Sequence, residues 1–165
     1  MPSEKKASSN EAYTVTIEEA EPRYIAAMQA RVTLDDVGDK LPPLMEKAWK
    51  HAKKAGLEPS DPSIVFYSPQ PGEDFEKDGC DIDAGPTIGG RFWTKGVLSC
   101  AMTPKGAVAK TTHTGEYHDL KNAHDAILKW CAANNHAVEG PCWEVYGPWT
   151  EDTDTLTTDV YYLLA

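Results

Sequence analysis

Long hydrophobic runs are missing from this chain of 165 residues. No stretch approaches the ~18 consecutive apolar residues of a membrane-spanning helix, which excludes that class of protein. Residues 1–11 hold two lysines but no apolar segment behind them, so they do not form a secretory signal, and a cytoplasmic location is expected. Because they are polar and show no periodicity, we predict that residues 1–11 are a disordered lead-in.

Positive charge is scarce. The chain has 16 Lys and Arg residues against 26 Asp and Glu residues, which gives a net charge of −10. A field of this sign repels phosphate backbones and anionic lipid, so we expect neither nucleic acid nor a membrane as a partner. A neutral or cationic ligand fits this charge better, although acidity is also common in proteins that use it only for solubility.

Motifs for metals, nucleotides and covalent catalysis are also missing. The four cysteines (Cys80, Cys100, Cys131 and Cys142) form no Cys-x-x-Cys pair, which argues against a zinc knuckle and a redox site. We expect reduced thiols that pack as small apolar groups. The sequence has no phosphate-binding loop, dinucleotide fingerprint or Gly-x-Ser-x-Gly motif. We therefore expect no metal and no cofactor.

Hydrophobic periodicity divides the rest of the chain into strands and two helices. Residues 38–55 carry an apolar stripe at helical spacing, with Pro42 and Pro43 in the expected first turn and Gly56 just after the end. A second stripe predicts a helix over 119–135. Runs with strand character predict strands at 13–18, 24–32, 63–67, 80–84, 97–102, 107–113, 142–146 and 157–164.

The two helix-and-strand units repeat with a shift of 79 residues, which aligns Leu41 with Leu120 and Tyr67 with Tyr146. Such a half cannot bury both of its faces alone, whereas two halves can share a sheet. The expected fold class is therefore α+β: a tandem duplication of two strand-helix-strand-strand units in an antiparallel sheet. We expect the two main helices on one face, a partly open second face, and a ligand groove between the halves.

The expected domain boundaries follow from this repeat. Residues 12–165 form one domain, with a first repeat over about 12–70 and a second over about 78–165. Residues 68–79 are rich in proline, glycine and acid, and they are the predicted internal linker.

Glu144 is the polar residue of the strand predicted at 142–146. Strand alternation puts Trp143 and Val145 on one side and Glu144 and Tyr146 on the other. The apolar pair is the natural helix-facing core, so we expect Glu144 on the face away from the helices. A carboxylate among large apolar groups costs free energy unless it has a partner or ligand. Two interpretations stay open: an edge glutamate that faces water, or a buried acid in an aromatic pocket.

Aromatic residues gather in the second half of the chain. Trp93 and Trp149 lie in segments rich in glycine and proline, and loop aromatics of this kind often line binding sites. They can equally close the ends of a small core. His124 lies on the apolar stripe of the second helix, and we expect it to be a hydrogen-bonded residue rather than a ligand.

The segments 113–117 (His-Thr-Gly-Glu-Tyr) and 143–148 (Trp-Glu-Val-Tyr-Gly-Pro), with the helix between them, resemble the GyrI-like small-molecule-binding domain. This effector-binding module is attached to many AraC-type and MerR-type regulators and also occurs alone. The resemblance covers most of residues 13–165. It implies a groove between the halves that takes bulky, aromatic or cationic compounds. It also implies that Glu144 is the central acid and that Tyr117 and Tyr146 are pocket tyrosines.

Two features depart from the family pattern. Residues 1–12 are too short and polar for a helix-turn-helix unit. Pro148 follows Tyr146 after a single glycine, closer than in the family, and residues 86–95 are interpreted as a lid-like insert. The expected ligand-binding residues are Glu144, Tyr146, Tyr117, Tyr67, Trp93, Trp149 and Tyr24.

Three functions stay open. The first is a stand-alone small-molecule-binding protein with a sensor or sequestering role. The second is a hydrolase that opens strained cyclopropane rings of cytotoxic natural products, in which Glu144 activates water and Tyr117 or Tyr146 polarises a carbonyl. The third is a gyrase-inhibitor-like protein that binds a protein partner, for which the acidic run 73–78 could supply a surface.

Overall fold

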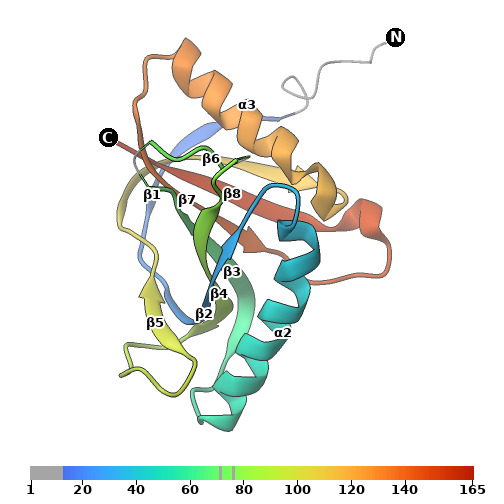
Figure 1. The fold of residues 1–165 in the computed structure, drawn as a ribbon. Helices are drawn as coiled ribbons and strands as arrows, with labels where there is room; N and C mark the ends of the chain where they lie inside the picture. Colours follow the sequence, from blue (N-terminus) through green and yellow to red (C-terminus); the bar gives the residue numbers. More distant parts are fainter. Residues whose placement is uncertain (1–12, 71, 76) are drawn as a thin grey trace.

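The computed structural model describes residues 13–70, 72–75 and 77–165, and these residues form an eight-stranded antiparallel sheet with two α-helices (Figure 1). The predicted lead-in over residues 1–11 lies outside the described residues. Among the described residues, no helix is long and apolar enough to cross a membrane. The α+β class and the antiparallel sheet are confirmed.

The elements agree with the predicted ones in number and order. The first strand begins at Thr16, three residues later than predicted, and the strand that carries Glu144 begins at Val138, four residues earlier. In chain order the elements are β1 (Thr16–Ala20), β2 (Tyr24–Val32), α2 (Val37–Lys54), β3 (Ser60–Ser68), β4 (Cys80–Ile88), β5 (Ser99–Met102), β6 (Gly106–Thr114), the 3-10 turn η2 (Tyr117–Asp119), α3 (Leu120–Ala133), β7 (Val138–Tyr146), the 3-10 turn η3 (Thr153–Thr155) and β8 (Thr157–Leu164).

The helix ends show where local sequence was sufficient and where it was not. Gly56 and Asn135 follow the two helices with φ of +76° and +60°, the left-handed conformation that ends a helix. The placement of the prolines in the first turn is wrong, because α2 begins at Val37 and Pro42 and Pro43 therefore lie in its second turn. Each proline there removes one backbone hydrogen bond of the helix.

The sheet order is symmetric about its centre. The strands run β1-β6-β8-β7-β3-β4-β2-β5, so β7 and β3 are central neighbours, with β8 and β6 on one side and β4 and β2 on the other. This order confirms two strand-helix-strand-strand units, β2-α2-β3-β4 and β6-α3-β7-β8, with β1 and β5 added at the edges. The order groups β4 with the first unit, whereas the boundary drawn from the sequence at 70–78 assigns it to the second.

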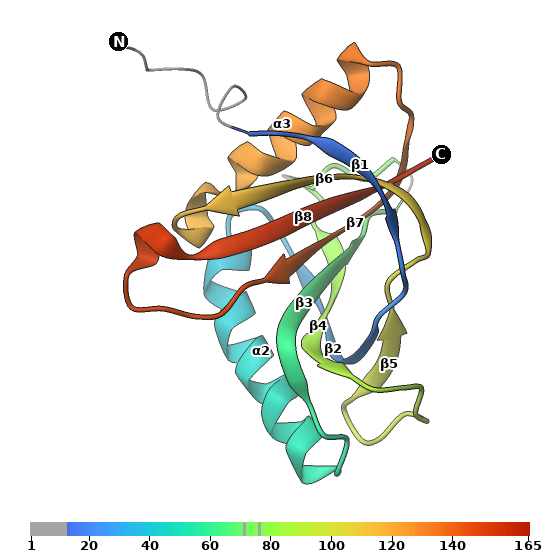
Figure 2. The ribbon, with the colours of Figure 1, turned by 180° about the vertical axis from the view of Figure 1, so that it is seen from behind.

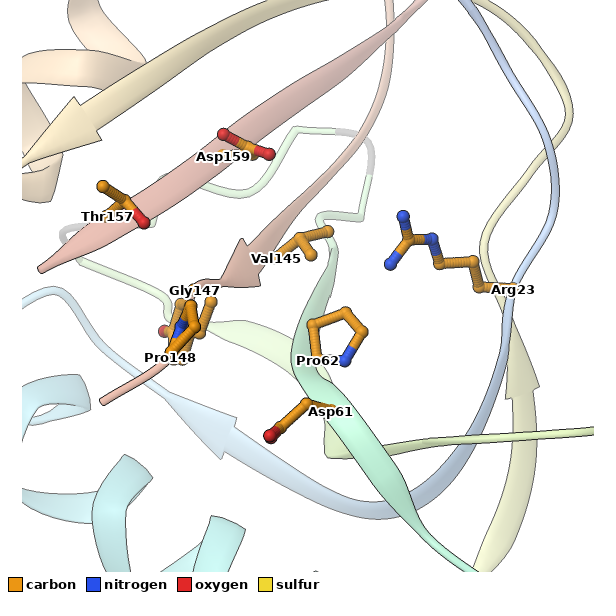
Figure 3. A pocket seen from close by; sticks show the side chains of 9 residues that line it. Arg23, Asp61, Pro62, Val145, Gly147, Pro148, Thr157 and Asp159 are labelled. Atoms are coloured by element: carbon orange, nitrogen blue, oxygen red, sulfur yellow. The ribbon is translucent and has the colours of Figure 1, made fainter. Parts of the chain in front are cut away.

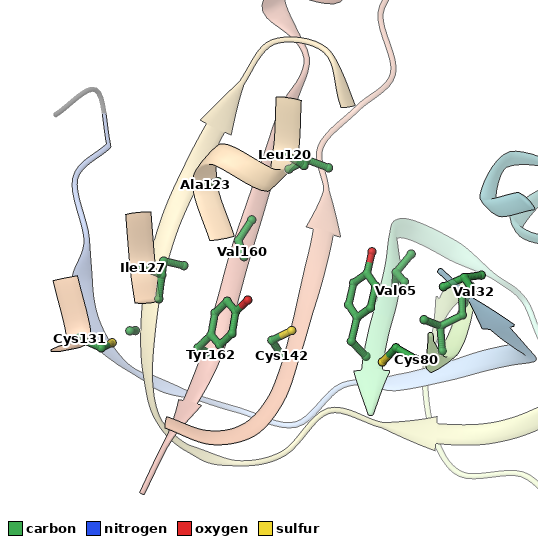
Figure 4. Close-up of a cluster of buried hydrophobic side chains, with 14 residues drawn as sticks. Val32, Val65, Cys80, Leu120, Ala123, Ile127, Cys131, Cys142, Val160 and Tyr162 are labelled. Carbon is green, nitrogen blue, oxygen red and sulfur yellow. The ribbon is translucent and has the colours of Figure 1, made fainter. Parts of the chain in front are cut away.

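Both helices cover the same side of the sheet, which we call the helix side. Helix α2 packs on β2 and β4, and α3 packs on β6 and β8 (Figure 1). A buried cluster on this side joins Val65 and Tyr67 of β3 to Leu120, Ala123 and Ile127 of α3 (Figure 4). The prediction of two helices on one face is confirmed.

The opposite side, which we call the back side, holds a second core. Ile25 of β2, Ile64 of β3 and Val108 of β6 are fully buried in one cluster there, although four strands separate β2 from β6 in the sheet. The sheet must therefore curl to bring its two halves together, as Figure 2 shows from behind. We expected this face to be partly open, and these apolar side chains fill its centre.

The side predicted for Glu144 is also wrong. Trp143 and Val145 were expected under the helices but lie in the back-side cluster with Ile64. Glu144 instead contacts His124 of α3 and so lies on the helix side. The alternation is correct, but curling buries both sides of the sheet. Apolar residues alone therefore do not tell the two sides apart.

Candidate functional site

Glu144 lies at the centre of the repeat symmetry. The shift of 79 residues places Val65 of β3 on Glu144 of β7, and these two residues are direct partners across the central strands. The pseudo-twofold axis therefore passes between them. Glu144 is 3% exposed, and its partner on the other side, Val160, is fully buried. Of the two interpretations drawn from the sequence, the structure shows the buried acid.

Two tyrosine hydroxyls donate hydrogen bonds to the same oxygen of Glu144. The hydroxyl of Tyr67 lies 3.1 Å from Oε1, and that of Tyr146 lies 2.8 Å from it. The same 79-residue shift relates these tyrosines, so each half of the domain supplies one donor. Burial, followed by the charge of Glu144, raises the pKa of both tyrosines well above 10. Both therefore keep their protons at neutral pH and act as donors.

His124 of α3 contacts the second carboxylate oxygen. Its Nε2 lies 2.6 Å from Oε2 of Glu144, and its Nδ1 lies 2.7 Å from the hydroxyl of Tyr162 on β8. Burial lowers the pKa of His124, but hydrogen bonds to Cys142 and Glu144 and the charge of Glu144 outweigh burial and raise it to about 10. At neutral pH this contact is an ion pair between an imidazolium and a carboxylate.

Two further aromatic rings cover the tyrosines that bind Glu144. Tyr117 of η2 stacks on Tyr146, with ring centroids 5.3 Å apart and 17° between the planes. Phe75 of the β3–β4 connection meets the ring of Tyr67 edge-on at 6.0 Å. Tyr117 is 37% exposed and forms the outer wall of the cluster. The structure thus brings together four predicted ligand-binding residues: Glu144, Tyr67, Tyr117 and Tyr146.

The other three predicted ligand-binding residues lie outside this cluster. Tyr24 packs in a separate apolar cluster at one end of the sheet, where the guanidinium of Arg91 lies 5.9 Å from its ring. Trp93, between β4 and β5, is 91% exposed, and Trp149, between β7 and β8, is 70% exposed. Trp149 follows Tyr146 by three residues, so it is the nearest of the three to the site along the chain.

The acidic run predicted as a surface for a protein partner is partly taken up within the domain. Glu73 forms an ion pair with Arg31 of β2. Asp78 accepts a hydrogen bond of 2.9 Å from the backbone N–H of Asp74. These contacts leave fewer of the acidic side chains of this segment available to a protein partner.

A cavity of about 320 Å³ opens on the back side of the sheet. Arg23, Asp61 and Asp159 are its charged residues, and they surround Val145 and Pro62 in Figure 3. Glu144 does not line this cavity, because its side chain points to the other side of β7. Glu144 itself is 3% exposed, and the rings of Tyr117 and Phe75 cover the tyrosines that bind it.

The cluster around Glu144 combines a carboxylate, an imidazolium and hydroxyl donors away from water. Such a carboxylate can accept an organic cation or a hydrogen-bond donor, and the aromatic rings add cation–π attraction. The pair of His124 and Glu144 can also hold or move a proton. Within the described part of the chain, no group of three or more His, Cys, Asp or Glu residues is placed to hold a metal ion.

Comparison with protein families identifies the fold. The family model of the GyrI-like small molecule binding domain matches residues 13–164. The chain belongs to this GyrI-like family. The match runs through both repeated units of the GyrI-like domain, and it confirms the resemblance carried by segments 113–117 and 143–148.

Several solved structures share the GyrI-like fold of this chain. The C-terminal domain of EcmrR has a TM-score of 0.75 and 18% identity, over 93% of this chain and 98% of that one. SAV2435 bound to tetraphenylphosphonium has a TM-score of 0.63 and 6% identity, over 92% and 94%. A hydrolase encoded by lin2189 from Listeria innocua has a TM-score of 0.58 and 9% identity, over 92% and 91%. At these identities the likeness shows the fold alone.

A second structure of EcmrR contains a chain that is longer than the GyrI-like domain. In its complex with DNA, the GyrI-like domain described here spans 57% of the EcmrR chain, with a TM-score of 0.74. A neighbour in a DNA complex gives no support to our expectation that nucleic acid is excluded as a partner. No curated protein sequence matches the chain.

Sequence reasoning missed His124 and Tyr162 as members of the site. The prediction that His124 is hydrogen-bonded is confirmed, but its partner Glu144 was not foreseen. A signal was present: the 79-residue shift places Met45 of the first helix on His124, so a titratable group replaces an apolar one on a core face. Tyr162 could have been found only with the strand register, which pairs it with Cys142.

Proposed function

We propose that this chain is a small-molecule-binding module that takes bulky aromatic or cationic compounds at Glu144, between α2 and α3, in a sensor or sequestering role. The observation that carries the proposal is a single buried carboxylate on the pseudo-twofold axis, walled by aromatic rings. The net charge of −10 favours the approach of cations. SAV2435, which shares the fold, is bound to the cation tetraphenylphosphonium, and this supports the choice of ligand class.

Access to Glu144 requires that the covering rings move. Tyr117 is partly exposed and stacks on Tyr146, so its rotation would uncover that side of the carboxylate. Phe75 is the matching cover on Tyr67. Trp149, just after β7, would border the opened pocket, and we propose it as a rim residue. Tyr24 and Trp93 are not needed for a pocket of this form.

A titration of tryptophan fluorescence with tetraphenylphosphonium tests this proposal. We expect saturable quenching of the wild type and an affinity at least tenfold lower for Glu144→Gln, because the amide removes the negative charge that lies within the site. Glu139→Gln is the matched control, since Glu139 is exposed on the same strand. The proposal fails if Glu144→Gln is folded and binds as tightly as the control.

A second candidate function is hydrolysis of strained cyclopropane compounds. The contact between Glu144 and His124 has the form of a general base, and one neighbour of the same fold is a hydrolase. Glu144 would take a proton from water, whose oxygen bonds to a ring carbon as the carbon–carbon bond breaks. The hydroxyl of Tyr117 or Tyr146 would donate to the adjoining carbonyl. The proton then passes to the other ring carbon.

Mass spectrometry distinguishes the two candidates. A compound with an activated cyclopropane ring, incubated with the wild-type protein, should gain the mass of one water if the domain is a hydrolase. Glu144→Gln should then abolish the product while Glu139→Gln leaves it unchanged. Binding without any product in the wild type favours the binding module.

A further inference from the structure

Glu144 already has a cationic partner inside the protein. Its Oε1 accepts from two tyrosine hydroxyls, and its Oε2 contacts Nε2 of His124 at 2.6 Å. The side chain of His124 is 17% exposed against 4% for that of Glu144. The imidazole, held by α3 above the sheet, is therefore the more accessible member of this pair.

The surroundings of His124 favour its charged form. Glu144 and Cys142 face it from β7, Tyr162 faces it from β8, and the edge of Tyr67 faces it from β3. Glu144 is the carboxylate among these groups, and together with Cys142 it raises the pKa of His124 to about 10 in spite of burial. On α3 itself, the neighbouring charges of Lys121 and Asp125 pair with each other at 2.8 Å.

A second cation in this site would leave an unbalanced positive charge. One carboxylate cannot neutralise both an imidazolium and a ligand cation, and an uncompensated buried charge is strongly unfavourable. On the basis of the proposed function, we infer that His124 is an internal counter-ion that exchanges with the ligand: an organic cation that binds at Glu144 displaces the proton of His124 to solvent.

This exchange makes affinity depend on pH in one direction. The proton leaves from a nitrogen of His124 to water or buffer, and the ligand cation takes over its charge beside Glu144. Below the pKa of His124, the affinity for a permanent cation should then increase as the pH is raised, by up to tenfold per pH unit. Close to one proton should be released for each ligand bound. A neutral ligand should show neither effect.

The repeat supplies the substitution that tests this inference. Met45 occupies the equivalent position of α2, so His124→Met places in the second helix the side chain that the first helix already carries. Glu144 then has no internal counter-ion, and the affinity for tetraphenylphosphonium should rise at least tenfold at pH 7. His124→Gln keeps a hydrogen-bond donor without a titratable charge and serves if the methionine variant does not fold. His118→Gln is the control, since the side chain of His118 is 71% exposed.

The experiment is calorimetric titration of the full chain with tetraphenylphosphonium from pH 6 to pH 9, in two buffers of different ionisation enthalpy. Proton release by the wild type and the control, together with tighter binding that no longer depends on pH in His124→Met or His124→Gln, supports the inference. Binding of the wild type without proton release or pH dependence overturns it and leaves the proposed function intact. No binding by the wild type or by any His124 variant at any pH overturns the proposed function, and the inference with it.

Discussion

The two repeated units place different side chains at equivalent points of the same scaffold. Val65 and Met45 occupy these points in the first unit, and Glu144 and His124 occupy them in the second. Val65 and Glu144 are direct cross-strand partners, so two glutamates there would have their Cβ atoms about 5 Å apart and their carboxylates would repel each other. The symmetric fold therefore accepts one acid on its axis, and the asymmetry of the sequence supplies the chemistry.

The tyrosines show the opposite behaviour. Tyr67 and Tyr146 are equivalent in the two units, and both donate to Oε1 of the one carboxylate. A symmetric pair of donors around an asymmetric acceptor lets the duplicated scaffold satisfy a buried charge from both halves. The comparison of the two units thus separates what the fold requires from what the site requires.

The largest effect on the free energy of unfolding is expected when the first unit also receives an acid on the axis. Val65→Glu buries a second carboxylate beside Glu144 without a counter-ion, and we expect a loss of about 5 kcal/mol in the free energy of unfolding at pH 7. Urea unfolding followed by circular dichroism measures this loss. Val65→Gln, which has the same shape without the charge, should lose clearly less. Equal losses for the two variants would contradict the argument from repulsion.

The next largest effect on the free energy of unfolding is expected when the acid of the second unit is replaced by an apolar residue. Glu144→Val leaves His124 and two tyrosine hydroxyls without their acceptor, which should cost about 3 kcal/mol. Adding His124→Met to Glu144→Val recreates the apolar pair of the first unit and should recover part of that loss. A double-mutant cycle in urea measures the coupling. Strictly additive losses would show that the ion pair does not couple the two residues.

Most of the fold was predictable because its signals are local or repeated. The apolar stripes and the residues Gly56 and Asn135 marked the helices, and the 79-residue shift gave the paired architecture. The side on which Glu144 lies was not predictable, since both sides of a curled sheet are buried and alternation assigns residues to sides without naming the side. The prediction for the two prolines of α2 was wrong because the helix was expected to begin at residue 38 instead of Val37, and both prolines were counted within its first turn.

The site was predictable only in part. Glu144 and Tyr146 followed from the strand pattern, Tyr67 followed from the repeat, and Tyr117 followed from the family resemblance. His124 reaches Glu144 only because α3 packs on β6 and β8 at a position from which its side chain meets β7, and this arrangement depends on the packing of the whole half. Single-residue signals do not carry such information.

The pH dependence of stability also separates the two units. The folded protein raises the pKa of His124 from 6.5 to about 10, so the folded state binds this proton more tightly than the unfolded state does. The stabilisation is complete below pH 6.5 and is lost as the pH rises to 10. Between pH 7 and pH 10, the free energy of unfolding of the wild type should therefore fall more steeply than that of His124→Met. Parallel curves in urea titrations would contradict this assignment.

The smallest effects concern the equivalent hydroxyls. Tyr146→Phe and Tyr67→Phe each remove one donor to Oε1, and each should lower the free energy of unfolding by about 1–2 kcal/mol. The change at Tyr146 should be the larger, because its hydrogen bond is 2.8 Å long against 3.1 Å for Tyr67. Tyr24→Phe, outside the cluster, is the control. Thermal unfolding of the three variants measures the differences, and an equal effect of all three would show that the hydroxyls do not stabilise Glu144.

The central claim is that the carboxylate on the pseudo-twofold axis is the ligand-binding acid. A crystal structure of the protein with tetraphenylphosphonium tests it most directly. The account predicts the phosphonium over Glu144 on the helix side, with the rings of Tyr117 and Phe75 moved away and the contact between His124 and Glu144 broken. A phosphonium in the back-side cavity near Asp61 and Asp159, with the cluster around Glu144 unchanged, would contradict it.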